Sequence, residues 1–230
     1  MSRKITIGIT DCSKYDNYKT WIEEEEGTVA IRLSPALNNL DDLGKCDGIL
    51  LTGGEDVHPR FYNKKEYVDL CEDIDEKRDE FEWKVLEYTA NNHVALLGIC
   101  RGLQMANVYF GGTLIPHIPA FGKFDHSKTG SSDKYHQVQV DPDSFLGSIV
   151  GSSGGEVNSA HHQSADLVGK GLVCNAISPD GIVEGLEREN AEDGPFLLLV
   201  QWHPERMKDQ ASRFSRSLKR TFLEAVKKSR

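Results

Sequence analysis

The sequence predicts an α/β fold: a three-layer sandwich with a mainly parallel central sheet and smaller antiparallel strands in the second half. The first observation is that strand and helix patterns alternate along the first half of the chain, as in sheets with helical crossovers. The second is the apolar run Val-Ala-Leu-Leu-Gly-Ile at residues 94–99, which is typical of a strand buried on both faces. Because the 230 residues show no interdomain linker, we expect residues 1–230 to form a single domain.

The elements of the first half follow from hydrophobic periodicity. Trp21 and Ile22 give the first predicted helix an inward face. Phe81 and Val85 do the same for the second helix, which has charged residues at the positions between them. In chain order we expect strands at 4–9, 28–33, 47–51 and 94–99, and helices at 17–26, 75–91 and 101–110.

The second half of the chain is less regular. Residues 119–134 are rich in Gly, Ser, Lys and Asp and predict an exposed loop. Several of the strands that follow are expected to be antiparallel, and a helix closes the chain. We expect the strands at 135–140, 171–178, 182–186 and 196–201, and the helix at 208–229.

Composition argues against several classes of protein. A formal net charge of −9 does not suit a nucleic-acid-binding surface, which needs a basic face. No apolar run approaches the roughly 20 residues of a membrane span, and the first residues have a strand pattern instead of the apolar core of a signal peptide. We therefore expect a cytoplasmic protein with neither nucleic acid nor membrane as a partner. Five cysteines without a Cys-x-x-Cys pair argue against disulfides and a structural zinc site.

The sharpest local signal is Gly-Ile-Cys-Arg-Gly at residues 98–102, where the buried strand ends and a helix begins. This arrangement has the form of a nucleophile elbow with cysteine in place of serine. Glycines two residues either side of Cys100 relieve crowding at the tight turn, and the helix N-terminus favours the thiolate form of its sulfur. A buried structural cysteine is the alternative, but the strand–turn–helix context favours a nucleophile.

A cysteine nucleophile generally needs a base and a group that orients the base. His203 follows the apolar strand Phe-Leu-Leu-Leu-Val-Gln-Trp, and Pro204 keeps the segment out of a helix. Residues two apart in an extended segment point the same way, so Glu205 can hold one imidazole nitrogen while the other faces Cys100. We therefore predict a catalytic triad of Cys100, His203 and Glu205.

The segments Gly-Ile-Cys-Arg-Gly-Leu-Gln and Gln-Trp-His-Pro-Glu together resemble the class I glutamine amidotransferase superfamily, whose fold is flavodoxin-like. Three more segments resemble its γ-glutamyl hydrolase branch, whose members cleave γ-glutamyl-γ-aminobutyrate and related amides. They are Leu-Thr-Gly-Gly-Glu-Asp-Val-His-Pro at 51–59, Asn-Ser-Ala-His-His-Gln at 158–163 and Ser-Pro-Asp-Gly-Ile-Val-Glu at 178–184. The resemblance extends over nearly the whole chain and implies a reaction that needs no metal or organic cofactor.

Further site residues follow from the chemistry and from the resemblance. Attack on a γ-carbonyl creates an oxyanion, which needs fixed N–H donors. The backbone N–H of Arg101 is one candidate because it follows the nucleophile. The turn at Gly53 and Gly54 is the other, since glycine lets a backbone N–H approach the substrate closely. By resemblance, Gln104 and His162 contact the glutamyl group.

The adjacent histidines at 161 and 162 raise the alternative of a metal site. Adjacent residues on a strand point apart, and no Asp, Glu or Cys ligand set accompanies this pair at metal spacing. We therefore expect no metal. The remaining histidines of loops and strand starts are expected to have no functional role: His58, His117, His126 and His136.

The leading functional hypothesis is a hydrolase with a small-molecule γ-glutamyl substrate. Cys100 attacks the γ-carbonyl, His203 moves the proton, and water hydrolyses the γ-glutamyl thioester to release glutamate. A second hypothesis is a glutaminase subunit that supplies ammonia to a separate synthetase, and a third is a non-enzymatic binding member of the fold. The sequence names neither the leaving amine nor the oligomeric state, monomer or homodimer.

Overall fold

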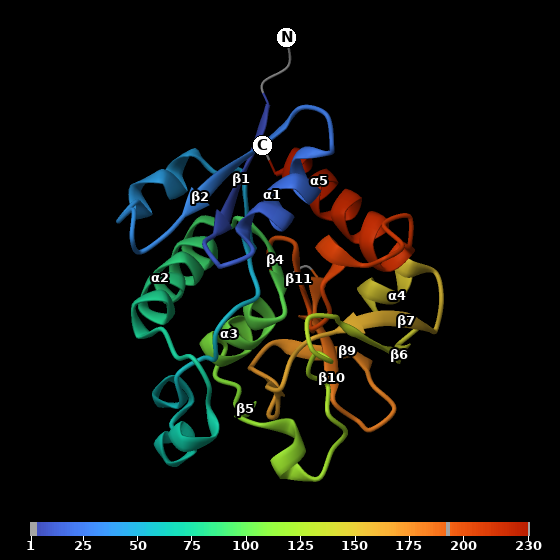
Figure 1. Ribbon diagram of the computed structural model, residues 1–230. Coiled ribbons are helices and arrows are strands. Elements are labelled where there is room, and N and C mark those ends of the chain that lie inside the picture. Colours follow the sequence, from blue (N-terminus) through green and yellow to red (C-terminus); the bar gives the residue numbers. More distant parts are fainter. Residues whose placement is uncertain (1–3, 192–193, 230) are drawn as a thin grey trace.

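The computed structural model describes residues 4–191 and 194–229 (Figure 1). Its helices and strands alternate in the first half of the chain, as predicted. In chain order the elements are β1 Ile5–Thr10, α1 Tyr15–Glu23, β2 Thr28–Leu33, β3 Gly48–Leu51, α2 Glu76–Asn92, β4 Ala95–Ile99, α3 Arg101–Tyr109, β5 Leu114–Ile115, β6 Lys134–Val140, α4 Phe145–Val150, β7 Gly154–Ser159, β8 Ser164–Ala165, β9 Leu172–Ile177, β10 Val183–Arg188, β11 Leu197–Val200 and α5 Leu218–Lys228.

Within the described residues, nine strands form one sheet in the order β2-β1-β3-β4-β11-β10-β9-β6-β7. Neighbouring strands from β2 to β11 are parallel. From β11 to β7 they are antiparallel. The short strands β5 and β8 pair separately. The predicted α/β fold, with a parallel central sheet extended by antiparallel strands, is therefore confirmed.

Helices cover both faces of the parallel part of the sheet (Figure 1). One core cluster joins Trp21 of α1 and Phe222 of α5 to Leu97 of β4. The other joins Val85 of α2 to Leu96 of β4. Because successive residues of β4 face opposite layers, the strand is buried on both sides, as its apolar run predicts. No helix in the described part of the chain has both the length and the apolar surface that a bilayer span requires.

The first predicted helix, at 17–26, is displaced toward the N-terminus. The observed α1 spans Tyr15–Glu23. A turn then joins it to β2, with the N–H of Thr28 donating to the carbonyl of Glu25 at 3.2 Å and Gly27 at a φ of +83°. A helix cannot continue through that left-handed conformation, which glycine adopts at little cost.

The second half contains elements that were not predicted. Strand β7 and helix α4 were both missed. The sequence of β7, Gly-Gly-Glu-Val-Asn-Ser, has little strand preference, and pairing with β6 gives it that conformation. The helix predicted at 208–229 is also too long. It starts at Leu218 after a π-helical turn over Arg213–Ser217, which the Ser212 side chain caps by accepting the N–H of Phe214. Gln210 belongs to the preceding loop, where its amide donates to the carbonyls of Pro204 and Met207.

Candidate active site

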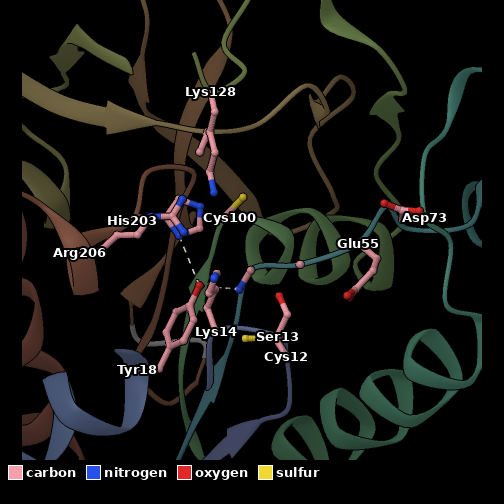
Figure 2. Close-up of a pocket in the computed structure, with 13 residues that line it drawn as sticks. Cys12, Ser13, Lys14, Tyr18, Glu55, Asp73, Cys100, Lys128, His203 and Arg206 are labelled. Atoms are coloured by element: carbon pink, nitrogen blue, oxygen red, sulfur yellow. Dashed lines mark hydrogen bonds between the residues drawn. The ribbon is translucent and has the colours of Figure 1, made fainter. Parts of the chain in front are cut away.

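A pocket of about 270 Å³ opens where β3, β4 and β11 reach their carboxyl ends. Open α/β sheets generally bind ligands at this edge. Its lining includes Gly53, Cys100 and His203, which follow these three strands. Figure 2 shows Cys100 and His203 next to each other, with Tyr18 approaching the imidazole. The fold thus gathers three predicted site residues in one cavity.

Cys100 occupies a strained turn between β4 and α3. Its backbone has φ of 53° and ψ of −106°, a combination that L-residues rarely adopt. The flanking glycines are required by packing. A Cβ on Gly98 would lie 2.6 Å from Leu199 Cδ2, and one on Gly102 would lie 2.5 Å from the Leu51 carbonyl oxygen. The expected crowding around the elbow is therefore present, and glycine relieves it on both sides.

His203 and Glu205 meet at the end of β11. Nδ1 of His203 lies 2.9 Å from Glu205 Oε1, which leaves Nε2 for Cys100, the predicted nucleophile. Burial alone would lower the pKa of this imidazole, but the charges of Glu205 and Cys100 outweigh burial and raise the pKa to about 9. The prediction of an extended segment is wrong, because Pro204–Arg206 forms a 3-10 turn. That tighter turn still places carboxylate and imidazole together.

Two residues that the sequence did not reveal hold the imidazole in place. The Tyr18 hydroxyl lies 3.3 Å from His203 Nδ1. The side-chain oxygen of Asn158 accepts the backbone N–H of His203 at 3.1 Å. Tyr18 lies on the inward face of α1, where a buried tyrosine is indistinguishable by pattern from a core aromatic. Asn158 could have been found only through the segment at 158–163.

The turn after β3 requires glycine at both positions. A Cβ on Gly53 would lie 2.8 Å from Cε1 of His203, and a Cβ on Gly54 would collide with the Arg78 guanidinium. The N–H of Gly53 donates to the Tyr18 hydroxyl at 3.0 Å. One of the two predicted oxyanion donors in this turn is therefore engaged inside the protein, while Gly54 lines the pocket.

A buried group of four charged residues lies behind the elbow; we call it the acid–base cluster. Its members are Arg78, Asp79, Glu82 and Arg101, all buried. The Arg101 guanidinium donates to Asp79 and to Glu82. Arg78 donates from Nε to Glu82 at 2.9 Å and from Nη2 to the carbonyl of Gly53 at 2.9 Å. The cluster thereby ties the glycine turn to the helix that begins after Cys100.

Gln104 lies behind the nucleophile and not in the pocket. It is buried, and its amide donates to the backbone carbonyl of Gln163 at 3.0 Å. The same amide lies 3.3 Å from the side-chain oxygen of Gln201, whose own amide approaches Cys100 Sγ at 3.5 Å. Among the described residues, those that line the pocket do not include Gln104. A contact with the glutamyl group stays a prediction.

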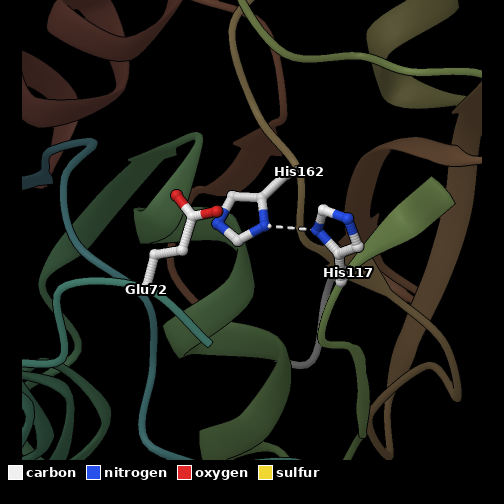
Figure 3. Close-up of side chains that lie close together, drawn as sticks. All are labelled: Glu72, His117 and His162. Atoms are coloured by element: carbon white, nitrogen blue, oxygen red, sulfur yellow. Dashed lines mark hydrogen bonds between the residues drawn. The ribbon is translucent and has the colours of Figure 1, made fainter. Parts of the chain in front are cut away.

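His162 is also absent from the lining of this pocket among the described residues. Its Nε2 lies 2.9 Å from Asp56 Oδ1, and its Nδ1 lies 3.1 Å from Nδ1 of His117. Figure 3 shows these two rings together with the carboxylate of Glu72. A contact between His162 and the substrate therefore stays a prediction.

A second thiol lines the pocket beside the first. Cys12, to which the sequence assigned no role, lies in the loop after β1 (Figure 2). Burial raises the pKa of the Cys12 thiol, although a hydrogen bond with Thr52 opposes this effect. A raised pKa lowers the thiolate fraction, so Cys12 is a poor nucleophile at neutral pH.

Comparisons with known proteins agree with this geometry. The sequence matches the model of the Peptidase C26 family over residues 7–205. A Schizosaccharomyces pombe protein provisionally named a glutamine amidotransferase is 35% identical over 85% of this chain and 77% of its own length. The γ-glutamyl-γ-aminobutyrate hydrolase PuuD of Escherichia coli K12 is 32% identical over 71% of this chain and 65% of its own length.

Solved structures share the fold at low sequence identity. A glutamine amidotransferase from Thermotoga maritima superposes with a TM-score of 0.64 at 15% identity, covering 99% of this chain and 86% of the other. The glutaminase domain of CTPS from Trypanosoma brucei gives 0.66 at 14% identity, covering 98% and 94%. The family match spans most of the described residues. The chain therefore belongs to the Peptidase C26 family, whose members are class I glutamine amidotransferase-like enzymes.

Proposed function

We propose that this protein hydrolyses γ-glutamyl amide bonds through a cysteine-bound γ-glutamyl thioester, releasing glutamate and an amine. The observation that carries the proposal is the strained Cys100 beside an imidazole that Glu205 holds at 2.9 Å. The similarity to a γ-glutamyl-γ-aminobutyrate hydrolase supports the substrate class. We take γ-glutamyl-γ-aminobutyrate as the reference substrate.

The reaction has two halves that share one base. First, Cys100 Sγ attacks the γ-carbonyl carbon with its proton already held by His203, whose pKa of about 9 keeps the imidazole protonated at neutral pH. The tetrahedral intermediate then collapses, the C–N bond breaks, and the amine leaves with the proton from the imidazolium. Next, His203 takes a proton from water, whose oxygen attacks the thioester carbon. The C–S bond breaks, glutamate leaves, and the proton stays on His203.

The oxyanion of each tetrahedral intermediate needs two backbone donors. We assign them to the N–H groups of Gly54 and Arg101. Gly54 follows the strand next to the elbow, and Arg101 opens α3 directly after Cys100. The N–H of Gly53 serves instead to position Tyr18.

Charges of both signs around the pocket fit the head group of glutamate. Lys14 and Lys128 belong to its lining, as do the carboxylates of Glu55 and Asp73 (Figure 2). A γ-linked glutamate carries an α-carboxylate and an α-ammonium group at neutral pH. Pairing these with opposite charges orients the γ-carbonyl toward Cys100, because both ends of the head group are then fixed.

A product screen by mass spectrometry tests the reaction. The chain is incubated with γ-glutamyl-γ-aminobutyrate, γ-glutamyl polyamines, γ-glutamyl amino acids and glutamine, with Cys100→Ala as the control. We expect glutamate and the free amine from at least one γ-glutamyl amide, faster than from glutamine. Turnover of glutamine alone would favour the glutaminase hypothesis. No turnover, together with no labelling of Cys100 by an electrophilic glutamine analogue, would favour a binding protein.

Recognition of the head group can be tested separately. Lys128→Met should raise KM for the best substrate about tenfold, the effect of losing one charge-assisted hydrogen bond. Lys84→Met is the matched control, since Lys84 is exposed on α2 and is not among the residues that line the pocket. Equal KM values for the two variants would remove Lys128 from the proposal.

A further inference from the structure

Three histidines and a glutamate meet inside the antiparallel half of the sheet; we call them the histidine cluster. His136 lies on β6, Glu184 on β10, His161 two residues after the end of β7, and His126 in the loop before β6. The side chains of His126 and His161 are 2% exposed, and that of Glu184 is fully buried. The expectation that no carboxylate accompanies His161 is therefore wrong, because its neighbours come from distant segments. The loop at 119–134 is largely exposed, as expected, and His126 is the buried exception within it.

One carboxylate oxygen is the centre of this cluster. Oε1 of Glu184 lies 3.4 Å from Nδ1 of His126, 3.3 Å from Nε2 of His136 and 3.5 Å from Nε2 of His161. Within the described residues, none of these three nitrogens and neither oxygen of Glu184 has a hydrogen-bond partner. Buried polar atoms without partners are rare in folded proteins, and a group that joins these five would satisfy all of them at once.

The other ring nitrogens show which atoms carry protons. Nε2 of His126 lies 3.2 Å from Oδ1 of Asp180, and Nδ1 of His161 lies 3.0 Å from the carbonyl oxygen of Gln163. Both partners only accept, so each histidine donates its N–H there. The nitrogens that face Glu184 are then lone pairs directed at a carboxylate. A cation between them would remove the repulsion between these lone pairs and the carboxylate.

We propose that His126, His161 and Glu184 bind a divalent transition-metal ion, with Zn²⁺ as the best match. Nε2 of His136 lies beside this set, 3.3 Å from Glu184 Oε1. Imidazole and carboxylate ligands without a thiolate suit zinc and its neighbours in the first transition row. The ligand atoms of the first three residues all lie within 4.8 Å of one another. The proposal concerns a structural ion and uses no step of the proposed reaction.

The distances support an ion over shared protons. Zinc bonds of about 2.0–2.2 Å place neighbouring ligand atoms of a tetrahedron about 3.3–3.6 Å apart. Glu184 Oε1 lies 3.4 Å from Nδ1 of His126 and 3.5 Å from Nε2 of His161. Charge-assisted hydrogen bonds are shorter, about 2.7–2.9 Å. A proton on every facing nitrogen would also make imidazolium ions of both His126 and His161, because their outer nitrogens already donate.

The hydrogen bonds that His126 and His161 make with their other ring nitrogens are also typical of metal-binding histidines. A histidine that ligates a metal commonly donates its other N–H to a carboxylate or a backbone carbonyl, which fixes both tautomer and ring orientation. Asp180 does this for His126, and the carbonyl of Gln163 does it for His161. Asp180 is itself held by the Ser178 hydroxyl at 2.6 Å.

The group of Glu72, His117 and His162 offers a useful contrast (Figure 3). Its ligand atoms are also close together, but Glu72 is exposed and the two rings are half-buried. Each ring nitrogen of His162 already has a partner, His117 on one side and Asp56 on the other. No orphaned atom there calls for a cation, so this group serves as the internal control.

The proposed ion would stabilise the wall of the active site. The backbone carbonyl of Glu184 accepts the N–H of Gln201 at 2.8 Å, and the Gln201 amide approaches Cys100 Sγ at 3.5 Å. His161 follows Ala160, which lines the pocket. The ion would therefore fix two segments that contact the pocket without touching substrate.

Metal content and thermal stability test the proposal. The full chain carries Cys100→Ala, so that zinc cannot bind the nucleophile, and has no polyhistidine tag. Elemental analysis after dialysis should find about one Zn²⁺ per chain. Chelation should lower Tm, and Zn²⁺ but not Mg²⁺ should restore it, because a ligand that binds only the folded state stabilises that state. A metal-free chain whose Tm does not respond to Zn²⁺ would overturn the proposal.

Matched variants identify the ligands. Glu184→Gln removes the charge at nearly constant shape and should weaken Zn²⁺ binding at least ~100-fold, whereas Glu72→Gln should leave it unchanged. Asp180→Asn, which leaves every proposed ligand in place, should weaken binding about 10–100-fold and decides the question if Glu184→Gln does not fold. The opposite pattern would refute the proposal. If zinc binding survives Glu184→Gln or Asp180→Asn but is lost in Glu72→Gln, the ion belongs to the group of Glu72, His117 and His162.

Discussion

The acid–base cluster and the histidine cluster are both buried beside the proposed triad, yet they differ in how fully their charged and polar atoms are paired. In the first, two guanidinium groups and two carboxylates bond directly to one another. In the second, three imidazoles surround one carboxylate and leave the facing atoms without partners. The comparison shows that burial of charge alone does not mark a binding site. Among the residues that the structure describes, the histidine cluster differs in leaving five facing atoms without partners, whereas the acid–base cluster leaves Arg101 Nε alone in that state.

Neither cluster contains the reacting atoms, so the largest effect on turnover should come from Cys100→Ala. We expect a loss of at least ~10³-fold, because no other group supplies the nucleophile. The circular dichroism spectrum should be unchanged. Steady-state kinetics on one γ-glutamyl amide measure the loss. Retention of more than about a tenth of wild-type turnover would place the nucleophile elsewhere.

The acid–base cluster should have the largest effect on stability. Arg101→Met leaves two buried carboxylates short of a partner and should lower the free energy of unfolding by about 3–5 kcal/mol. Arg60→Met is the control, because Arg60 pairs with Glu80 at 2.7 Å on the surface and should cost about 0–1 kcal/mol. Urea unfolding gives both values. Similar losses of unfolding free energy in the two variants would show that burial does not make the Arg101 ion pairs more important than the surface pair.

Substitution of the predicted base, His203, should reduce activity more than substitution of Glu205, which orients the base. His203→Ala removes the only group positioned to take the thiol proton and to protonate the amine, so its activity should fall nearly as far as that of Cys100→Ala. Glu205→Gln keeps the size and one oxygen of the side chain. It should retain roughly 10–100-fold more activity than His203→Ala. Kinetics of both variants on one substrate decide this, and equal losses would show that the carboxylate does more than orient the ring.

The pH dependence of stability should report the charge on His203. Its pKa in the folded protein is raised to about 9, from roughly 6.5 in an unfolded chain. The resulting stabilisation is fully present below about pH 6.5 and is lost as the pH rises through about 9. The free energy of unfolding of the wild type should therefore fall across this window, and that of His203→Gln should fall less. Parallel profiles for the two proteins would contradict the raised pKa.

Much of the parallel half could be predicted because its signals are local. The apolar run of β4 and the glycines around Cys100 lie in one short segment, and so do His203 and Glu205. Each segment shows which side chains reach the carboxyl edge of the sheet. The fold then brings the two segments together by pairing β4 with β11.

The rest depends on contacts between distant segments. Tyr18 reaches His203 from α1, and no motif distinguishes it from a core residue. The histidine cluster draws on four segments, one of them β6, whose partner β7 has little strand preference of its own. Periodicity and spacing describe neighbours along the chain, so they cannot reveal a group assembled by sheet pairing.

The position of β11 between β4 and β10 has a consequence for synthesis on the ribosome. The cysteine and its strand leave the ribosome long before residues 197–205 are made, so the nascent chain carries the thiol without its base. One edge of β4 stays unpaired over that period, and such an edge is prone to pair with other chains. Closure of the sheet is also slow, because it joins strands far apart in sequence. Insertion of β11 closes this edge and, in the same event, brings the predicted base to the thiol.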